Sequence, residues 1–108
     1  MTSQVINQVA ILTPKQGKFD ELAAEITNIT KKVQENEPET LVYYAYADAK
    51  KEEIIVVERY VNQAALDKHR GSPYFQDLIK KAPELLGKPL ELKLGNELLQ
   101  DSAQVVRM

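Results

Sequence analysis

The sequence predicts an α+β fold in which a four-stranded antiparallel sheet carries helices on one face. Three observations predict it: helical and strand periodicities alternate along the chain, prolines and glycines separate the periodic segments, and 108 residues suffice for one core. Apolar residues make up 44% and charged residues 28% of the chain, close to the average for globular domains and far from that of disordered chains. We therefore expect a single domain over residues 1–108.

The first half of the chain predicts a strand, a long helix and a second strand. Residues 4–13 carry apolar side chains at both parities until Pro14 ends the strand, so both of its faces should be covered. Residues 19–33 repeat apolar side chains every three or four positions, as amphipathic helices do. Glu37-Pro38 ends that helix, because the residue before a proline is pushed out of the helical region. Residues 40–47, rich in β-branched and aromatic side chains, predict the second strand.

The second half predicts a third strand, a broken helical region and a fourth strand. Residues 54–61 should form an antiparallel hairpin with the second strand. Asn62 is a good N-cap for a short helix, and Ser72-Pro73 begins another after a break at Gly71. Residues 89–95 alternate leucines with Glu and Lys, which is the pattern of a half-buried strand.

The order β-α-β-β-α-β is the ferredoxin-like arrangement. Its helices cover one sheet face only, yet the first three strands carry apolar side chains at both parities, so the other face also needs a cover. The sequence contains no second set of strands to supply it. A copy of the chain related by two-fold symmetry is the economical source, and we expect a homodimer.

Composition argues against several classes of protein and site. Fourteen basic and sixteen acidic residues give a net charge of -2 without a basic stripe, so nucleic acid is not an expected partner. The chain has no cysteine, which excludes disulfides and thiolate ligands. Residues 1–12 lack a signal-peptide pattern and no apolar run reaches bilayer length, so we expect a cytoplasmic protein without a membrane partner. Ligand spacing and the isolated glycines predict no metal and no cofactor.

Three polar residues are candidates for catalysis. His69 is the only histidine, and imidazole is the natural general base near neutral pH, although a histidine at a helix end can also serve as a cap. Glu58 interrupts an apolar strand on its buried parity, where it could orient His69 or pair with Arg59. Asn7, inside the first strand, could hold a substrate oxygen or satisfy the backbone.

Aromatic side chains are the candidates for substrate contact. The chain has five tyrosines and two phenylalanines, and tyrosines at strand spacing are more often packing residues than ligands of a substrate. The tyrosines that could line an aromatic cavity are Tyr43, Tyr44, Tyr46, Tyr60 and Tyr74. The candidates for substrate contact are Tyr44, Tyr46, Tyr60, Tyr74 and Phe75.

The segment from Glu58 to Phe75 resembles part of the antibiotic-biosynthesis-monooxygenase family, in which a third strand feeds a helix ending in His-x-x-Ser/Thr-Pro. The similarity extends to Pro14–Leu22 and Glu37–Leu41 and covers a core of residues 4–95. It implies a dimeric α+β barrel built from two four-stranded sheets, with each active-site cavity between one sheet and its helices. Residues 96–108 could pack on the partner subunit.

Within the family, the chain looks closest to the small quinol monooxygenases and to the phospho-diketone isomerase of quorum-signal breakdown, which share Glu58 and His69 of the motif. The isomerase resemblance continues through residues 85–90 and 95–98. Family monooxygenases oxidise an electron-rich phenol or anthrone with molecular oxygen and without metal or flavin, because the deprotonated substrate delivers the electron. The resemblance implies His69 as the base, with Asn7 and a tyrosine holding the oxyanion.

Three functions therefore compete. The first is a cofactor-independent monooxygenase of a small or polycyclic phenol or quinol, and the second is an isomerase of a small dicarbonyl compound. A phosphorylated substrate would call for clustered positive charge, whereas Lys93 lies beside Glu91. The third is a non-catalytic ligand-binding or stress-response protein, because the tryptophan and the usual tyrosine of anthrone-oxidising relatives are missing. Haem degradation is not expected, since Leu78 or its neighbour stands where that branch has a histidine.

Overall fold

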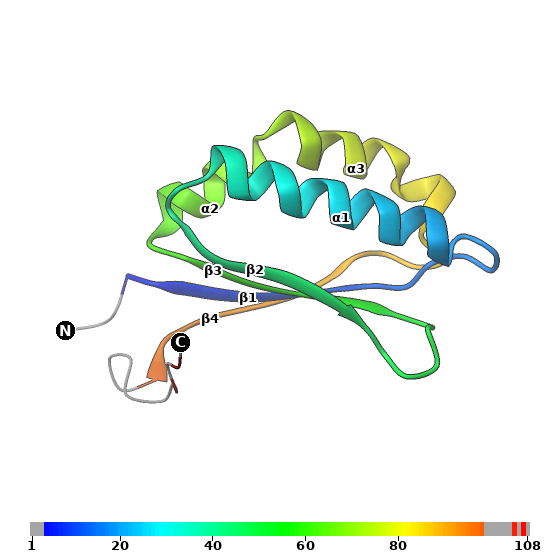
Figure 1. Ribbon diagram of the computed structural model, residues 1–108, viewed down its shortest axis with the longest axis horizontal. Coiled ribbons are helices and arrows are strands. Elements are labelled where there is room, and N and C mark those ends of the chain that lie inside the picture. The colour runs from blue at the N-terminus through cyan, green and yellow to red at the C-terminus, as the bar shows by residue number, and fades with distance from the viewer. Residues whose placement is uncertain (1–3, 99–104, 106, 108) are drawn as a thin grey trace.

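The computed structural model describes residues 4–98, 105 and 107. Its strands β1 (Ile6–Leu12), β2 (Thr40–Ala47), β3 (Ile54–Tyr60) and β4 (Glu91–Asn96) form one antiparallel sheet in the order β2-β3-β1-β4. Its helices α1 (Phe19–Asn36), α2 (Gln63–Arg70) and α3 (Pro73–Leu85) lie on one face of that sheet (Figure 1). The predicted α+β fold is confirmed, and the second helical region divides at Gly71 as expected.

The helices form where apolar spacing and caps coincide. Helix α1 buries Leu22, Ile26, Ile29 and Val33, which share one side of the helix. Asn62 begins α2 by accepting a hydrogen bond on its side-chain oxygen from the Ala65 amide at 2.9 Å. The cap at Asn62 therefore fixes where the chain turns from β3 into α2, the helix that carries His69.

The two faces of the sheet differ in cover. Alternate residues of β1, among them Gln8 and Leu12, are buried beneath the helices, and so are Val56 and Glu58 of the neighbouring β3. The intervening side chains point to the opposite face, which no helix of the described residues covers (Figure 1). The apolar residues of this outer face are Val9, Ile11, Val42, Tyr44, Tyr46, Ile55 and Val57.

Strand β4 differs from expectation. Its alternating pattern predicts a half-buried strand, but all six of its residues are exposed, so this prediction is wrong. The reason is its place at the edge of the sheet, where it pairs with β1 alone and the helices do not reach over it. Leu92 and Leu94 lie opposite Ala10 and Gln8, hence on the helical side, and are 39% and 50% exposed.

Backbone hydrogen bonds hold the connection between α3 and β4 against the end of β1. The Lys15 amide donates to the Leu85 carbonyl at 2.8 Å, and the Gly87 amide donates to the Thr13 carbonyl at 2.7 Å. A bridge between Pro14 and Leu86 lies between them. The end of α3 is thus fixed beside the sheet, and this fixes one end of the cavity described below.

Replacing Leu22 by alanine should lower the free energy of unfolding by about 2–5 kcal/mol, because it empties a fully buried site between α1 and the sheet. Urea denaturation of both proteins measures the difference. The matched control is Ile79→Ala on α3, a position that is 41% exposed, which should cost less than about 1 kcal/mol. Equal losses in the two variants would contradict the assignment of the core.

Candidate active site

The centre of the site is His69, which lies in the last turn of α2 and is only 1% exposed. Its Nδ1 lies 3.0 Å from Oε2 and 3.2 Å from Oε1 of Glu37, the residue that caps the end of α1. Because an ionised carboxylate only accepts hydrogen bonds, Nδ1 carries the proton in this pair. The neutral imidazole therefore keeps its free lone pair on Nε2, where it can accept a proton from a ligand.

Glu37 is held by two further donors. The Thr40 hydroxyl donates to Oε1 at 2.7 Å, and the Tyr74 hydroxyl donates a short hydrogen bond to Oε2. Burial by itself would raise the pKa of Glu37, but the hydrogen bonds from His69, Tyr74 and Thr40 outweigh it, so the pKa lies below its usual value. The carboxylate is thus kept ionised at neutral pH, as a group that orients a histidine must be.

Aromatic rings surround the imidazole. The centroid of the His69 ring lies 5.3 Å from that of Tyr43, 5.7 Å from Tyr60, 6.3 Å from Tyr74 and 5.3 Å from Phe75. These rings come from two strands and from the start of α3. They exclude bulk water from the imidazole, which strengthens its electrostatic interactions.

A second buried carboxylate, Glu58, lies on β3 and faces the same side of the sheet. Its Oε1 accepts hydrogen bonds from Gln8 Nε2 at 2.8 Å and from the Tyr60 hydroxyl at 2.5 Å. Arg70 Nη2 in turn donates to Gln8 Oε1 at 2.9 Å. Burial raises the pKa of Glu58, and the hydrogen bonds from Tyr60 and Gln8 offset this only in part.

Two cavities adjoin this cluster. A small one of about 20 Å³ is lined by Gln8, Glu58, His69 and Arg70 among others, and it has room for a single water or hydroxyl group. A larger one of about 390 Å³ lies between α3 and residues 86–90. The two share the side chains of Leu12, Leu78 and Leu90.

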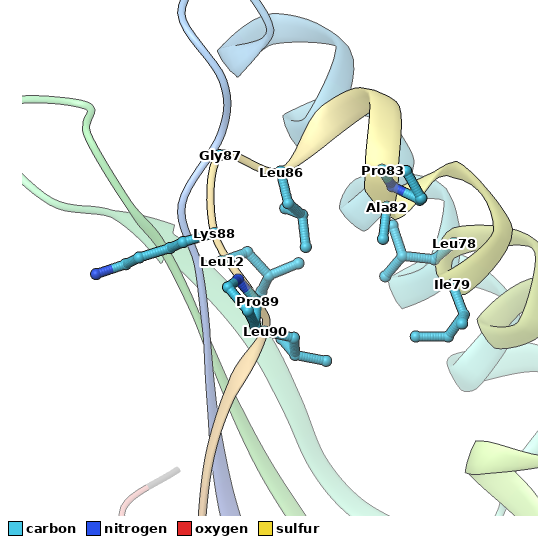
Figure 2. Close-up of a pocket in the computed structure, with 10 residues that line it drawn as sticks. All are labelled: Leu12, Leu78, Ile79, Ala82, Pro83, Leu86, Gly87, Lys88, Pro89 and Leu90. Carbon is cyan, nitrogen blue, oxygen red and sulfur yellow. The ribbon is translucent and has the colours of Figure 1, made fainter.

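The larger cavity is apolar. Figure 2 shows leucine side chains entering it from the sheet side and Leu78, Ile79 and Ala82 facing them from α3. The only charged side chain in its lining, Lys88, points away from the space between them (Figure 2). A flat apolar ring suits this cavity better than a strongly hydrated group.

The structure brings together most of the residues expected from sequence. His69, Glu58 and Tyr60 lie in one cluster, with Tyr74 and Phe75 in ring contact with His69. Glu58 does not contact the imidazole through a hydrogen bond and does not pair with Arg59, whose partner is Glu97 at 2.5 Å. The position that orients His69 belongs to Glu37.

Three expected residues lie elsewhere. Asn7 points to the outer face, because its neighbour Gln8 takes the buried position beneath the helices, so the expectation that Asn7 borders the cavity of His69 is wrong. Tyr44 and Tyr46 pair with Val57 and Ile55 on the same outer face and are 52% and 53% exposed. They do not line either cavity.

Three residues of the cluster were not expected: Glu37, Gln8 and Arg70. Glu37 had one usable signal: Pro38 ends the helix so that Glu37 caps it, and Thr40, a possible hydrogen-bond donor, follows three residues later. Gln8 is the neighbour of the expected Asn7 and lies on the other parity of β1. A strand with apolar side chains at both odd and even positions, such as β1, does not show in its sequence which set faces the helices.

No group of His, Asp or Glu side chains among residues 4–98, 105 and 107 could hold a metal ion. None of the three helices described is long and apolar enough to cross a membrane. The described site is therefore one of hydrogen-bonded carboxylates, an imidazole and aromatic rings.

The model of the antibiotic biosynthesis monooxygenase (ABM) family matches residues 5–81, and the chain belongs to this family. The Synechocystis protein sll1783 is 38% identical over 60 residues, which is 55% of this chain and 41% of that protein. The Mycobacterium tuberculosis protein Rv0793 is 36% identical over 61 residues, which is 56% of this chain and 60% of that protein. The chain thus spans less than two thirds of either curated relative.

Solved structures agree on the fold. The structure of Rv0793 has a TM-score of 0.83 at 26% identity, with 91% of this chain and 99% of that chain covered. The Shewanella oneidensis protein SO0527 has a TM-score of 0.81 at 23% identity, with 88% and 92% covered. The ferredoxin-like arrangement is therefore shared with these proteins.

The raised pKa of Glu58 predicts a pH-dependent gain in stability on Glu58→Gln. The folded state binds the Glu58 proton more tightly than the unfolded chain, so the favourable contribution of this group is present at low pH and is lost as pH rises through the raised value. Glutamine keeps an acceptor for Gln8 and Tyr60 but does not titrate. Urea denaturation measures the free energy of unfolding of both proteins at pH 5 and pH 8. The value of the variant relative to that of the parent should be higher at pH 8 than at pH 5. A variant whose free energy of unfolding falls relative to that of the parent as pH rises would contradict the prediction.

Proposed function

We propose that this protein is a cofactor-independent monooxygenase that oxidises a small or polycyclic phenol with molecular oxygen. The observation that carries the proposal is the buried imidazole of His69, with Nδ1 taken by Glu37 and the ring at the wall of a cavity. Such an imidazole is a base whose orientation is set before the substrate arrives. The membership of the ABM family supports the reaction class.

In the proposed reaction, Nε2 of His69 takes the proton of the phenolic hydroxyl. The imidazolium that forms is stabilised by Glu37, whose ionised state Thr40 and Tyr74 maintain. The phenolate is electron-rich enough to pass an electron to oxygen, and the surrounding rings exclude water from the charged intermediates. The apolar cavity beside the three shared leucines accommodates the remainder of the substrate.

An isomerase of a small dicarbonyl compound would use the same base to remove a proton next to a carbonyl. The absence of an inward-pointing cation from the larger cavity disfavours a phosphorylated substrate there, because phosphate recognition uses several positive groups (Figure 2). Oxygen consumption distinguishes the two reactions, because the monooxygenase consumes oxygen and the isomerase does not. Uptake of oxygen with naphthols or anthrone as substrates, by protein freed of metal, tests the monooxygenase directly.

Replacing His69 by alanine should lower turnover of a phenol by about 10²- to 10⁴-fold, the range that positioned proton transfer contributes. Steady-state oxygen uptake measures it.

His69→Gln separates catalysis from packing. A glutamine amide can still donate to Glu37 but cannot act as the base. We expect this variant to be as inactive as His69→Ala and more stable than it. Retained turnover in a destabilised His69 variant would assign the residue to structure and end the catalytic proposal.

We further propose that the outer face of the sheet packs against a second copy of the chain. The face is apolar at its centre, at Val9 and Val57, and carries both signs of charge near its edge, at Glu91 and Lys93. A two-fold axis can therefore pair its charges while burying its apolar centre. Residues 96–108, which we expect to pack on the partner, fall mostly outside the described residues.

Sedimentation at micromolar concentration should report twice the chain mass of 12.2 kDa. Val57→Glu places a charge at the centre of the outer face and should yield a monomer, whereas Lys32→Glu on the outward side of α1 should not. A folded parent that sediments as a monomer would contradict the proposed dimer.

A further inference from the structure

Arg70 is a cation at the cavity without a carboxylate partner. Its Nη2 donates to Gln8 Oε1, and none of the ion pairs among the described residues includes it. The side chain is half-buried and lines the small cavity beside His69. A guanidinium that is partly withdrawn from water and keeps free N–H donors is well suited to an anion.

Glu58 does not take that role. Its Oε1 is occupied by Gln8 and Tyr60, and Gln8 stands between the carboxylate and the guanidinium. Burial raises the pKa of Glu58, and Arg70 therefore opposes this rise through its charge and not through an ion pair, while Arg70 itself lines the small cavity.

Arg70 marks the polar end of a cleft that is apolar elsewhere. We use "the α3–β4 cleft" for the two cavities together, bounded by Leu78 of α3 on one side and by Leu90 and Leu92 on the other. Its floor follows β1 from Leu12 to Gln8, which is four residues or about 13 Å of strand. The apolar end can hold one or two fused rings, and the opposite end carries the guanidinium of Arg70 beside the carboxyl group of Glu58.

We propose that the substrate is a hydroxylated aromatic carboxylate, with its rings in the apolar part of the α3–β4 cleft and its carboxylate paired with Arg70. Because His69 and Arg70 both line the small cavity, a hydroxyl next to the carboxylate on the ring comes within reach of the imidazole. The small cavity, of about 20 Å³, must widen to admit both groups. The proposal rests on the proposed function, since it names the substrate class of the same site. It does not require turnover for its test.

The test compares two ligands of one shape, 1-hydroxy-2-naphthoate and the neutral 1-hydroxy-2-naphthamide, by calorimetric titration without oxygen. The parent should bind the carboxylate about tenfold or more tightly, because charged hydrogen bonds are stronger than neutral ones. Arg70→Gln should remove this preference while leaving the affinity for the amide within about twofold. Arg70→Lys, which keeps the charge but loses the planar fork, should keep part of the preference.

The matched control is Lys68→Gln, which removes the same charge from the exposed side of α2. It should leave the preference unchanged. Equal binding of the two ligands by the parent, no binding of either, or a preference that survives Arg70→Gln would each overturn the proposal. So would equal losses in the Lys68 and Arg70 variants, because they would indicate net charge alone.

The outcomes also separate this proposal from the proposed function. Oxygen uptake with neutral naphthols, together with equal binding of the two ligands, would remove the role of Arg70 and leave the monooxygenase. Selective binding of the carboxylate without oxygen uptake would leave Arg70 as the anion site of a protein that does not oxidise this ligand.

Discussion

The buried carboxylate of Glu37 is the interaction on which the candidate site depends. It lies where α1 ends and accepts hydrogen bonds from β2 through Thr40, from α2 through His69 and from α3 through Tyr74. Because an unpaired buried charge costs several kcal/mol, these four elements must meet in one arrangement for the folded state to satisfy it. The direction of the imidazole is thus set by the way the whole helical layer closes on the sheet.

The elements themselves could be predicted from the sequence, because their signals are local. The apolar repeat of α1 and the caps at Asn62 and Ser72 are each decided by a few neighbouring residues, and the structure follows them closely. Glu58 could be placed on the buried face for a similar reason, since Val56 and Tyr60 share its parity and flank it in an otherwise apolar strand. The burial of a single polar residue can be predicted from sequence when the apolar residues of its strand mark one face as buried.

The rest of the site could not be predicted because it depends on a choice between faces that the sequence leaves open. Strand β1 has apolar side chains at both parities, so neither Asn7 nor Gln8 is marked as the one beneath the helices. Strand β2 has aromatic residues at both parities too, and Tyr43 rather than Tyr44 turns toward His69. The choice is made by the packing of α1 across the sheet, which involves residues far apart in the chain.

The exposed edge strand has a consequence for how the site is reached. Strand β4 is hydrogen-bonded to β1 only, carries no helix and buries little of its own surface, so it belongs to the part of the molecule with the lowest free energy of local opening. Its detachment leaves the other strands and the helical layer paired, because none of their hydrogen bonds with one another passes through it. The side of the small cavity that Leu92 lines can therefore open while His69 and Glu37 stay in place. We expect ligand exchange to proceed by fraying of β4 at the sheet edge, measurable as rapid amide exchange confined to Glu91–Asn96.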